Sequence, residues 1–105
     1  MQIIIVGCGK VGTALAVQLS QEDNNVTVVD KDSTVIRNIT SMYDVMGIVG
    51  NGASYGTLKE ADIEHADLLI AVSRSDELNL LCCVIAHQAA KCHGGEPLLR
   101  VAEID

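Results

Sequence analysis

A chain of 105 residues, 49% of them hydrophobic, has room for a single domain with one modest core. A net charge of -7, scattered Lys and Arg residues and only 2% aromatic residues exclude a nucleic-acid interface, which needs a basic surface and rings for base stacking. The apolar runs are too short to span a membrane, so we expect a soluble protein that reaches a membrane only through a partner.

The cysteines indicate the redox compartment. Cys8, Cys82, Cys83 and Cys92 form no C-x-x-C pair, and two of them are adjacent in an apolar helix pattern. Such residues are typical of a reduced core, which indicates the cytosol. The N-terminus begins directly with a strand pattern, so we expect no signal peptide.

Strand and helix patterns alternate along the whole chain. Short continuous apolar runs predict buried strands, and apolar residues at helical spacing predict the helices between them. The predicted strands are residues 3–6, 26–29, 45–49, 68–72 and 98–104. The first and third predicted helices are residues 11–21 and 54–61; the second is capped by Asp32 or Ser33, and the fourth begins after Ser73 or Ser75 and ends near residue 91. Residues 92–95 are predicted to form a loop.

This order predicts an α/β, doubly wound parallel sheet of the Rossmann-like type, because crossovers between parallel strands are right-handed. Five strands are seen, and the last element of a complete six-stranded fold is missing. We therefore expect one domain, residues 1–105, that is a fragment of a longer chain or is completed by association. The exposed edge of the fifth strand favours a dimer.

A glycine-rich segment carries the main functional signal. Its residues are Gly7, Cys8, Gly9, Lys10, Val11 and Gly12, which fit G-x-G-x-x-G directly after a buried strand and at the start of a helix. The first glycine allows a tight turn, the second lets a pyrophosphate approach, and the third lets the helix pack on the strand. The helix N-terminus supplies amide donors and positive dipole to the phosphates. The alternative is an ordinary strand-to-helix turn.

Asp30 ends the second predicted strand, 18 residues beyond Gly12. A carboxylate there can accept the ribose hydroxyls of an adenosine and would repel a 2′-phosphate, which disfavours NADP. Alternatively, Asp30 caps the following helix. Lys10 can balance phosphate charge, although a lysine at a helix start is also often simply solvated.

Further candidates follow the third and fourth predicted strands, at the edge where such folds bind ligands. The segment Gly50, Asn51, Gly52 and Ala53 can line the adenine side or form a simple turn. Ser73 and Arg74 can reach the second half of a dinucleotide. Glu77 can meet a ribose or a cation, but its position is also explained by the helix dipole alone.

Some residues look chemical without forming a convincing site. Cys83 and His87 lie one helical turn apart, yet such pairs are usually core and surface residues, so we expect no metal site. Asn79, on an apolar helix, is expected to hydrogen-bond a neighbouring element or a dimer mate. No Ser-His-Asp set or carboxylate pair can be placed, so we expect no enzyme.

The chain as a whole resembles the N-terminal RCK/KTN domain of Trk-type potassium-uptake regulators. The resemblance is carried by residues 3–12, 28–32, 49–54, 67–72, 75–79 and 99–101. It implies binding of NAD(H), ATP or ADP, with the phosphates at Gly7–Val11 and the adenosine ribose at Asp30, in a segment that includes Lys31. It also implies that the adenine lies beside residues 51–53 and the distal half of a dinucleotide beside Ser73-Arg74. Arg100 is expected at the rim of the site. The approach to the fifth strand, residues 92–97, is longer than the family pattern leads us to expect.

The resemblance implies a regulatory module that changes shape on nucleotide binding and acts on a potassium channel or transporter at the inner face of the cell membrane. An alternative is the cofactor domain of an NAD-dependent oxidoreductase, because fold does not determine function. A third hypothesis is an association module in which the nucleotide is only structural. The residues do not distinguish NAD, NADH, ATP and ADP.

Overall fold

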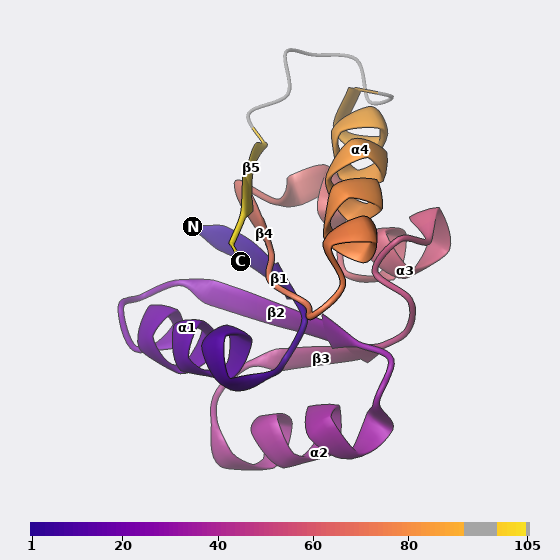
Figure 1. Cartoon of the computed structure of the whole chain (residues 1–105). Helices are drawn as coiled ribbons and strands as arrows, with labels where there is room; N and C mark the ends of the chain where they lie inside the picture. Colours follow the sequence, from indigo (N-terminus) through magenta and orange to yellow (C-terminus); the bar gives the residue numbers. More distant parts are fainter. Residues whose placement is uncertain (92–98, 105) are drawn as a thin grey trace.

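The computed structural model describes residues 1–91 and 99–104, in which strands and helices alternate (Figure 1). The elements are β1 (Gln2–Val6), α1 (Lys10–Ser20), β2 (Asn25–Asp30), α2 (Ser33–Met42), β3 (Met46–Val49), α3 (Tyr55–Glu60), the 3-10 turn η1 (Ile63–His65), β4 (Leu68–Ala71), α4 (Asp76–Lys91) and β5 (Arg100–Glu103).

The five strands form one parallel sheet in the order β3-β2-β1-β4-β5. Val6 at the end of β1 is in register with Val29 of β2 and with Ala71 of β4. The carboxyl ends of these three strands therefore meet at one edge of the sheet. This strand order confirms the predicted α/β Rossmann-like fold.

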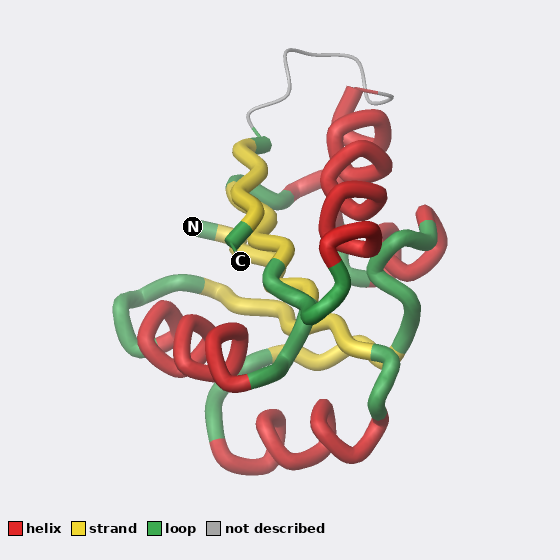
Figure 2. Tube along the Cα trace, in the orientation of Figure 1, coloured by secondary structure: helices red, strands yellow, loops and turns green. Residues whose placement is uncertain are grey.

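Helices cover both faces of the sheet (Figures 1 and 2). Alternate residues of β1 face opposite sides, because successive side chains of a strand point to opposite faces. Ile3 and Ile5 pack with residues of α1 and α2, whereas Ile4 and Val6 pack with residues of α3 and α4. The central strand is buried on both faces, which explains its continuous apolar run.

The predicted elements are all present, with shifted ends. Strand β5 covers fewer residues than the predicted 98–104, and η1 adds a turn that was not predicted. Asp32 is the cap of α2, because its side chain accepts hydrogen bonds from the Thr34 and Val35 backbone N–H groups at 2.9 and 3.4 Å. The predicted loop at residues 92–95 and the start of the fifth strand at Leu98 lie outside the described residues.

Candidate functional site

The turn between β1 and α1 is tight and is pressed against the connection between β4 and α4. Gly7 has a φ of 106°, a conformation that side chains disfavour, and a Cβ there would lie 2.6 Å from the Ser73 backbone nitrogen. A Cβ on Gly12 would overlap the Gly7 carbonyl oxygen. Both positions therefore require glycine for the packing of the chain itself.

Gly9 differs from these two glycines, because no atom lies within 4 Å of the place its Cβ would take. It is the N-cap residue of α1, where no side chain caps the helix and the first turn holds no acidic residue. Helices α2 and α4, by contrast, have Asp32 and Ser75 as side-chain caps. The open space and free helix end at Gly9 suit an anion.

Asp30 ties two loops together at the end of β2. Its Oδ2 accepts a hydrogen bond from the Cys8 N–H at 2.9 Å, and its Oδ1 accepts one from the Asp32 N–H, also at 2.9 Å. Because a carboxylate oxygen has more than one lone pair, each oxygen can still accept a hydroxyl. Asp32 caps α2, so the alternative that Asp30 does so is wrong.

A cleft of about 510 Å³ opens along the carboxyl edge of the sheet, between these loops. It brings together a large part of the predicted binding set, namely Gly7, Cys8, Gly9, Asp30, Lys31, Asn51, Gly52, Ser73 and Arg74. Charged side chains of both signs line the cleft. Asp30, Lys31 and Asp32 lie on the β2–α2 side, and Arg74 lies on the β4–α4 side. The cleft can therefore hold a ligand that carries both phosphate and hydroxyl groups.

The remaining predicted residues lie outside this cleft. Val11 is exposed on α1, and Gly12 is buried beneath the turn. Ala53 follows the Asn51 turn, in which the Ala53 N–H donates to Asn51 Oδ1 at 2.9 Å. Asn51 thus forms a turn and also lines the cleft. Glu77 is exposed in the first turn of α4, where the helix dipole accounts for it.

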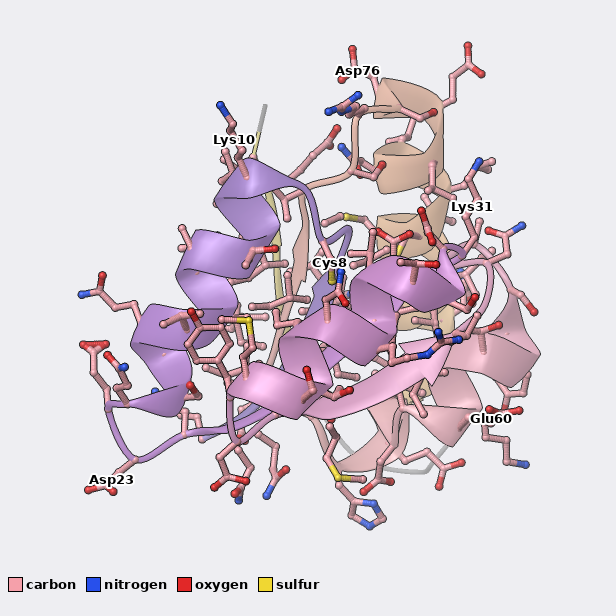
Figure 3. All side chains as sticks on the ribbon, turned by 90° about the horizontal axis from the view of Figure 1, so that it is seen from below. Cys8, Lys10, Asp23, Lys31, Glu60 and Asp76 are labelled. Carbon is pink, nitrogen blue, oxygen red and sulfur yellow. The ribbon has the colours of Figure 1, made fainter. Side chains whose placement is uncertain are left out.

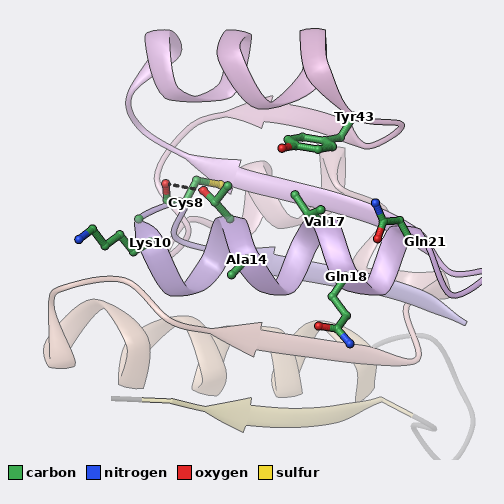
Figure 4. A pocket seen from close by; sticks show the side chains of 9 residues that line it. Cys8, Lys10, Ala14, Val17, Gln18, Gln21 and Tyr43 are labelled. Carbon is green, nitrogen blue, oxygen red and sulfur yellow. Dashed lines mark hydrogen bonds between the residues drawn. The ribbon is translucent and has the colours of Figure 1, made fainter.

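Lys10 borders a second, more open depression of about 700 Å³ (Figure 4). This depression lies along α1 and reaches Tyr43, and it shares Cys8 and Gly9 with the cleft. The Thr13 hydroxyl donates to the Cys8 carbonyl oxygen there at 3.1 Å. In Figure 4 the Lys10 side chain extends away from the helix, so it stands beside the glycine turn rather than in the cleft.

Arg100 lies at the other edge of the sheet. It is the first residue of β5 and is in register with Leu68, the first residue of β4. At the carboxyl edge β5 instead presents Glu103, in register with Ala71. The rim position expected for Arg100 is therefore not observed.

Figure 3 shows the two ends of the molecule, with Lys10, Lys31 and Asp76 at one and Asp23 and Glu60 at the other.

Sequence patterns missed several residues that line the cleft. They are Val6, Val29, Asp32, Val35, Val72, Ser75 and Leu78. A usable signal exists for those that flank strand ends, because every parallel strand of the sheet ends at the same edge. The signal is absent for Val35 and Leu78, which reach the cleft from the helices.

Burial keeps the thiols of two cysteines neutral. The pKa of Cys8 is raised to about 12 by burial and then by the charge of Asp30, and the pKa of Cys82 is raised to about 12 by burial and by Cys83. Burial also raises the pKa of Cys83. Within residues 1–91 and 99–104, no three His, Cys, Asp or Glu residues are grouped to hold a metal.

No helix in the described part of the chain combines the length and apolar character needed to cross a membrane.

Comparison with known sequences finds one family. A model described as the TrkA-N domain matches residues 3–96. A relative named Trk system potassium uptake protein TrkA, from Halomonas elongata, is 42% identical over 87 residues, which cover 83% of this chain and 19% of the relative. The Streptomyces coelicolor protein of the same name is 40% identical over 88 residues, 84% of this chain and 40% of the relative. The chain thus spans less than half the length of either relative.

Solved structures share the fold. The TrkA-N domain of the Escherichia coli inner membrane protein ybaL has a TM-score of 0.81 and 21% identity, over 97% of this chain and 70% of that one. The Shewanella denitrificans Kef CTD in AMP-bound form has a TM-score of 0.77 and 22% identity, over 98% and 58%. The GsuK channel bound to NAD has a TM-score of 0.73 and 18% identity, over 83% and 16%.

Proposed function

The chain belongs to the TrkA-N domain family, and from this premise we propose that it is a regulatory nucleotide-binding domain of a potassium-uptake system. Its ligand is NAD(H) or an adenine nucleotide. Binding changes the arrangement of the assembled domains, and a membrane channel or transporter responds. The domain spans residues 1–105 of this chain.

One observation carries the proposal: the free N-terminus of α1 at Gly9 and the carboxylate of Asp30 lie in one cleft. The former supplies amide donors for phosphate, and the latter supplies acceptors for ribose hydroxyls. Asn51 and Gly52 extend the cleft on the β3 side, where the adenine would lie. Ser73 and Arg74 extend it on the β4 side, where the distal half of a dinucleotide would lie.

Lys31 is an exposed cation in the same cleft and would contribute to the attraction of a phosphate-bearing ligand. Lys10, beside the turn, would do so from outside the cleft. Two fold neighbours support this class of ligand, because their names state AMP for the Kef CTD and NAD for the GsuK channel.

Regulation requires that the nucleotide bind one arrangement of the assembly more tightly than another. A differential affinity of about 1–3 kcal/mol is typical of such coupling. The assembly would be a homodimer or a larger oligomer of this chain on the cytoplasmic side, held at the membrane by its potassium-transporting partner. The family relation supports this placement, because the named relatives are potassium uptake proteins.

Isothermal titration calorimetry of the purified, nucleotide-free chain tests the proposal. We expect saturable binding of at least one of NAD, NADH, AMP, ADP and ATP, and much weaker binding of NADP, whose 2′-phosphate would approach Asp30. Absence of binding by all five would refute nucleotide regulation. Consumption of NADH with a small aldehyde would favour the oxidoreductase alternative instead.

A transport assay tests the second half of the proposal. Potassium uptake is compared in cells that carry the full-length protein with Asp30 or with Asp30→Ala. We expect the Asp30→Ala cells to lose the dependence of uptake on the nucleotide that the calorimetry identifies. The exposed Asp44, outside the cleft, provides Asp44→Ala as a control with the same change of charge. Equal uptake by all three would contradict regulation through this cleft.

A further inference from the structure

Within the described residues, Asn79 is the one polar residue that is fully buried, with an exposed fraction of 0%. It lies in the first turns of α4, within a helix whose other buried residues are apolar or sulfur-bearing. Burial of an amide costs free energy unless the group is hydrogen-bonded. Its presence at an interior position therefore calls for a specific set of partners.

The hydrogen bonds of the Asn79 side chain all go to atoms of one residue, Ser73, while the Asn79 backbone N–H donates to the Ser75 carbonyl oxygen. Asn79 Oδ1 accepts hydrogen bonds from the Ser73 backbone N–H at 2.9 Å and from the Ser73 hydroxyl at 2.7 Å. Asn79 Nδ2 donates to the Ser73 carbonyl oxygen at 3.1 Å. The side chain thus bonds both the backbone N–H and the backbone carbonyl oxygen of Ser73. This confirms the prediction that Asn79 hydrogen-bonds a neighbouring segment, here the connection between β4 and α4.

Ser73 is the residue on which the glycine turn rests. Its backbone nitrogen occupies the space beside Gly7, where a Cβ would come within 2.6 Å, and with Arg74 and Ser75 it forms the β4 wall of the cleft. The strand ladder ends before it, since the last β4 contact to β1 here is the Val72 N–H to the Val6 carbonyl oxygen at 2.9 Å. Beyond that bond, the Asn79 side chain holds the Ser73 backbone, and the Ser73 hydroxyl also bonds the backbone of Ser75.

We propose that Asn79 is a positioning residue of the nucleotide cleft, which holds Ser73 and Arg74 where the distal half of a dinucleotide reaches them. This inference rests on the proposed function and assigns the two halves of the ligand to different parts of the cleft. Asp30 and the glycine turn serve the adenosine and its phosphate, which AMP and NAD share. The wall held by Asn79 serves only the part that NAD has and AMP lacks.

The test measures the ratio of the dissociation constants for AMP and NAD, because general destabilisation would weaken both ligands alike. Asn79→Leu removes all the hydrogen bonds to Ser73, and Asn79→Asp keeps the acceptor but cannot donate to the Ser73 carbonyl oxygen. We expect Asn79→Leu to weaken NAD by about tenfold and AMP by less than about threefold, with Asn79→Asp intermediate. Circular dichroism first establishes that each variant is folded.

Two further variants keep the test decisive. Cys82→Ala opens a cavity at a fully buried position of the same helix that does not line the cleft, so it should lower stability and leave the ratio unchanged. Ser73→Ala removes the hydroxyl that donates to Asn79 Oδ1 and that also bonds the Ser75 backbone, and it should shift the ratio in the direction of Asn79→Leu, even if the latter fails to fold. Equal weakening of both ligands, or none, overturns the role of Asn79. A wild-type chain that binds neither ligand refutes the proposed function itself.

Discussion

The backbone N–H of Cys8 donates a hydrogen bond of 2.9 Å to the Asp30 carboxylate, although 22 residues separate them in the chain. This bond joins the glycine turn after β1 to the end of β2. The candidate phosphate site and the candidate ribose site are therefore one connected unit before any ligand arrives. Such preorganisation reduces the ordering cost of binding.

Replacement of Asp30 with Ala should weaken nucleotide binding by roughly 1.5–3 kcal/mol, the usual contribution of hydrogen bonds to a charged group. The variant also releases the Cys8 and Asp32 N–H groups, so a modest loss of stability should accompany the loss of affinity. Calorimetric titration gives the affinity, and Asp44→Ala is the control. Unchanged affinity would eliminate Asp30 as the ribose acceptor.

Two glycine substitutions should separate ligand binding from folding. The Cβ of Gly9→Ala meets no neighbouring atom within 4 Å, and the loss of unfolded-state freedom offsets the poorer N-cap that alanine makes, so we expect stability to change by less than about 1 kcal/mol, while the added methyl group obstructs the phosphate and lowers affinity. Gly12→Ala overlaps the Gly7 carbonyl oxygen and should lower stability by about 1–3 kcal/mol or more. Urea unfolding and titration of both variants check this, and full nucleotide affinity in Gly9→Ala would contradict the phosphate assignment.

Loss of the α2 cap should affect stability specifically. Asp32→Ala removes the acceptor of the Thr34 and Val35 N–H groups and should cost about 0.5–2 kcal/mol in the free energy of unfolding. Ser33→Ala, at the next position, is the matched control and should cost clearly less. If urea unfolding shows equal losses, Asp32 does not act as the principal cap.

Alkaline pH should destabilise the fold through its buried thiols. Cys8 and Cys82 have a pKa of about 12 in the folded chain against an ordinary value of 9.0. Above pH 9 the unfolded chain loses these protons and the folded chain keeps them, so the free energy of unfolding falls as the pH rises towards 12. Each thiol contributes at most about 1.4 kcal/mol per pH unit.

Denaturant unfolding between pH 8 and 11 measures this dependence. Cys8→Ala and Cys82→Ala should each flatten the decline relative to the wild-type chain, even though both also lower stability at pH 8 by removing packed atoms. The same slope in the wild type and both variants would show that other groups produce the alkaline loss.

Much of the fold could be predicted from the sequence because its signals are local. The apolar run at residues 3–6 predicts a strand buried on both faces, and Gly7, Gly9 and Gly12 predict the turn that follows it. The positions of Gly7 and Asp30 in one cleft also follow, since parallel strands in register end at one edge of the sheet.

Other features were decided by the tertiary structure alone. The position of Arg100 depends on the register in which β5 pairs with β4. The sequence of residues 98–104 contains no signal for that register. The partner of Asn79 could not be read from an apolar helix pattern, because Ser73 reaches the Asn79 side chain through the conformation of the turn that joins β4 to α4. Periodicity along the chain predicts which residues are buried, whereas the pairing of buried polar groups depends on contacts that exist only after the layers have packed.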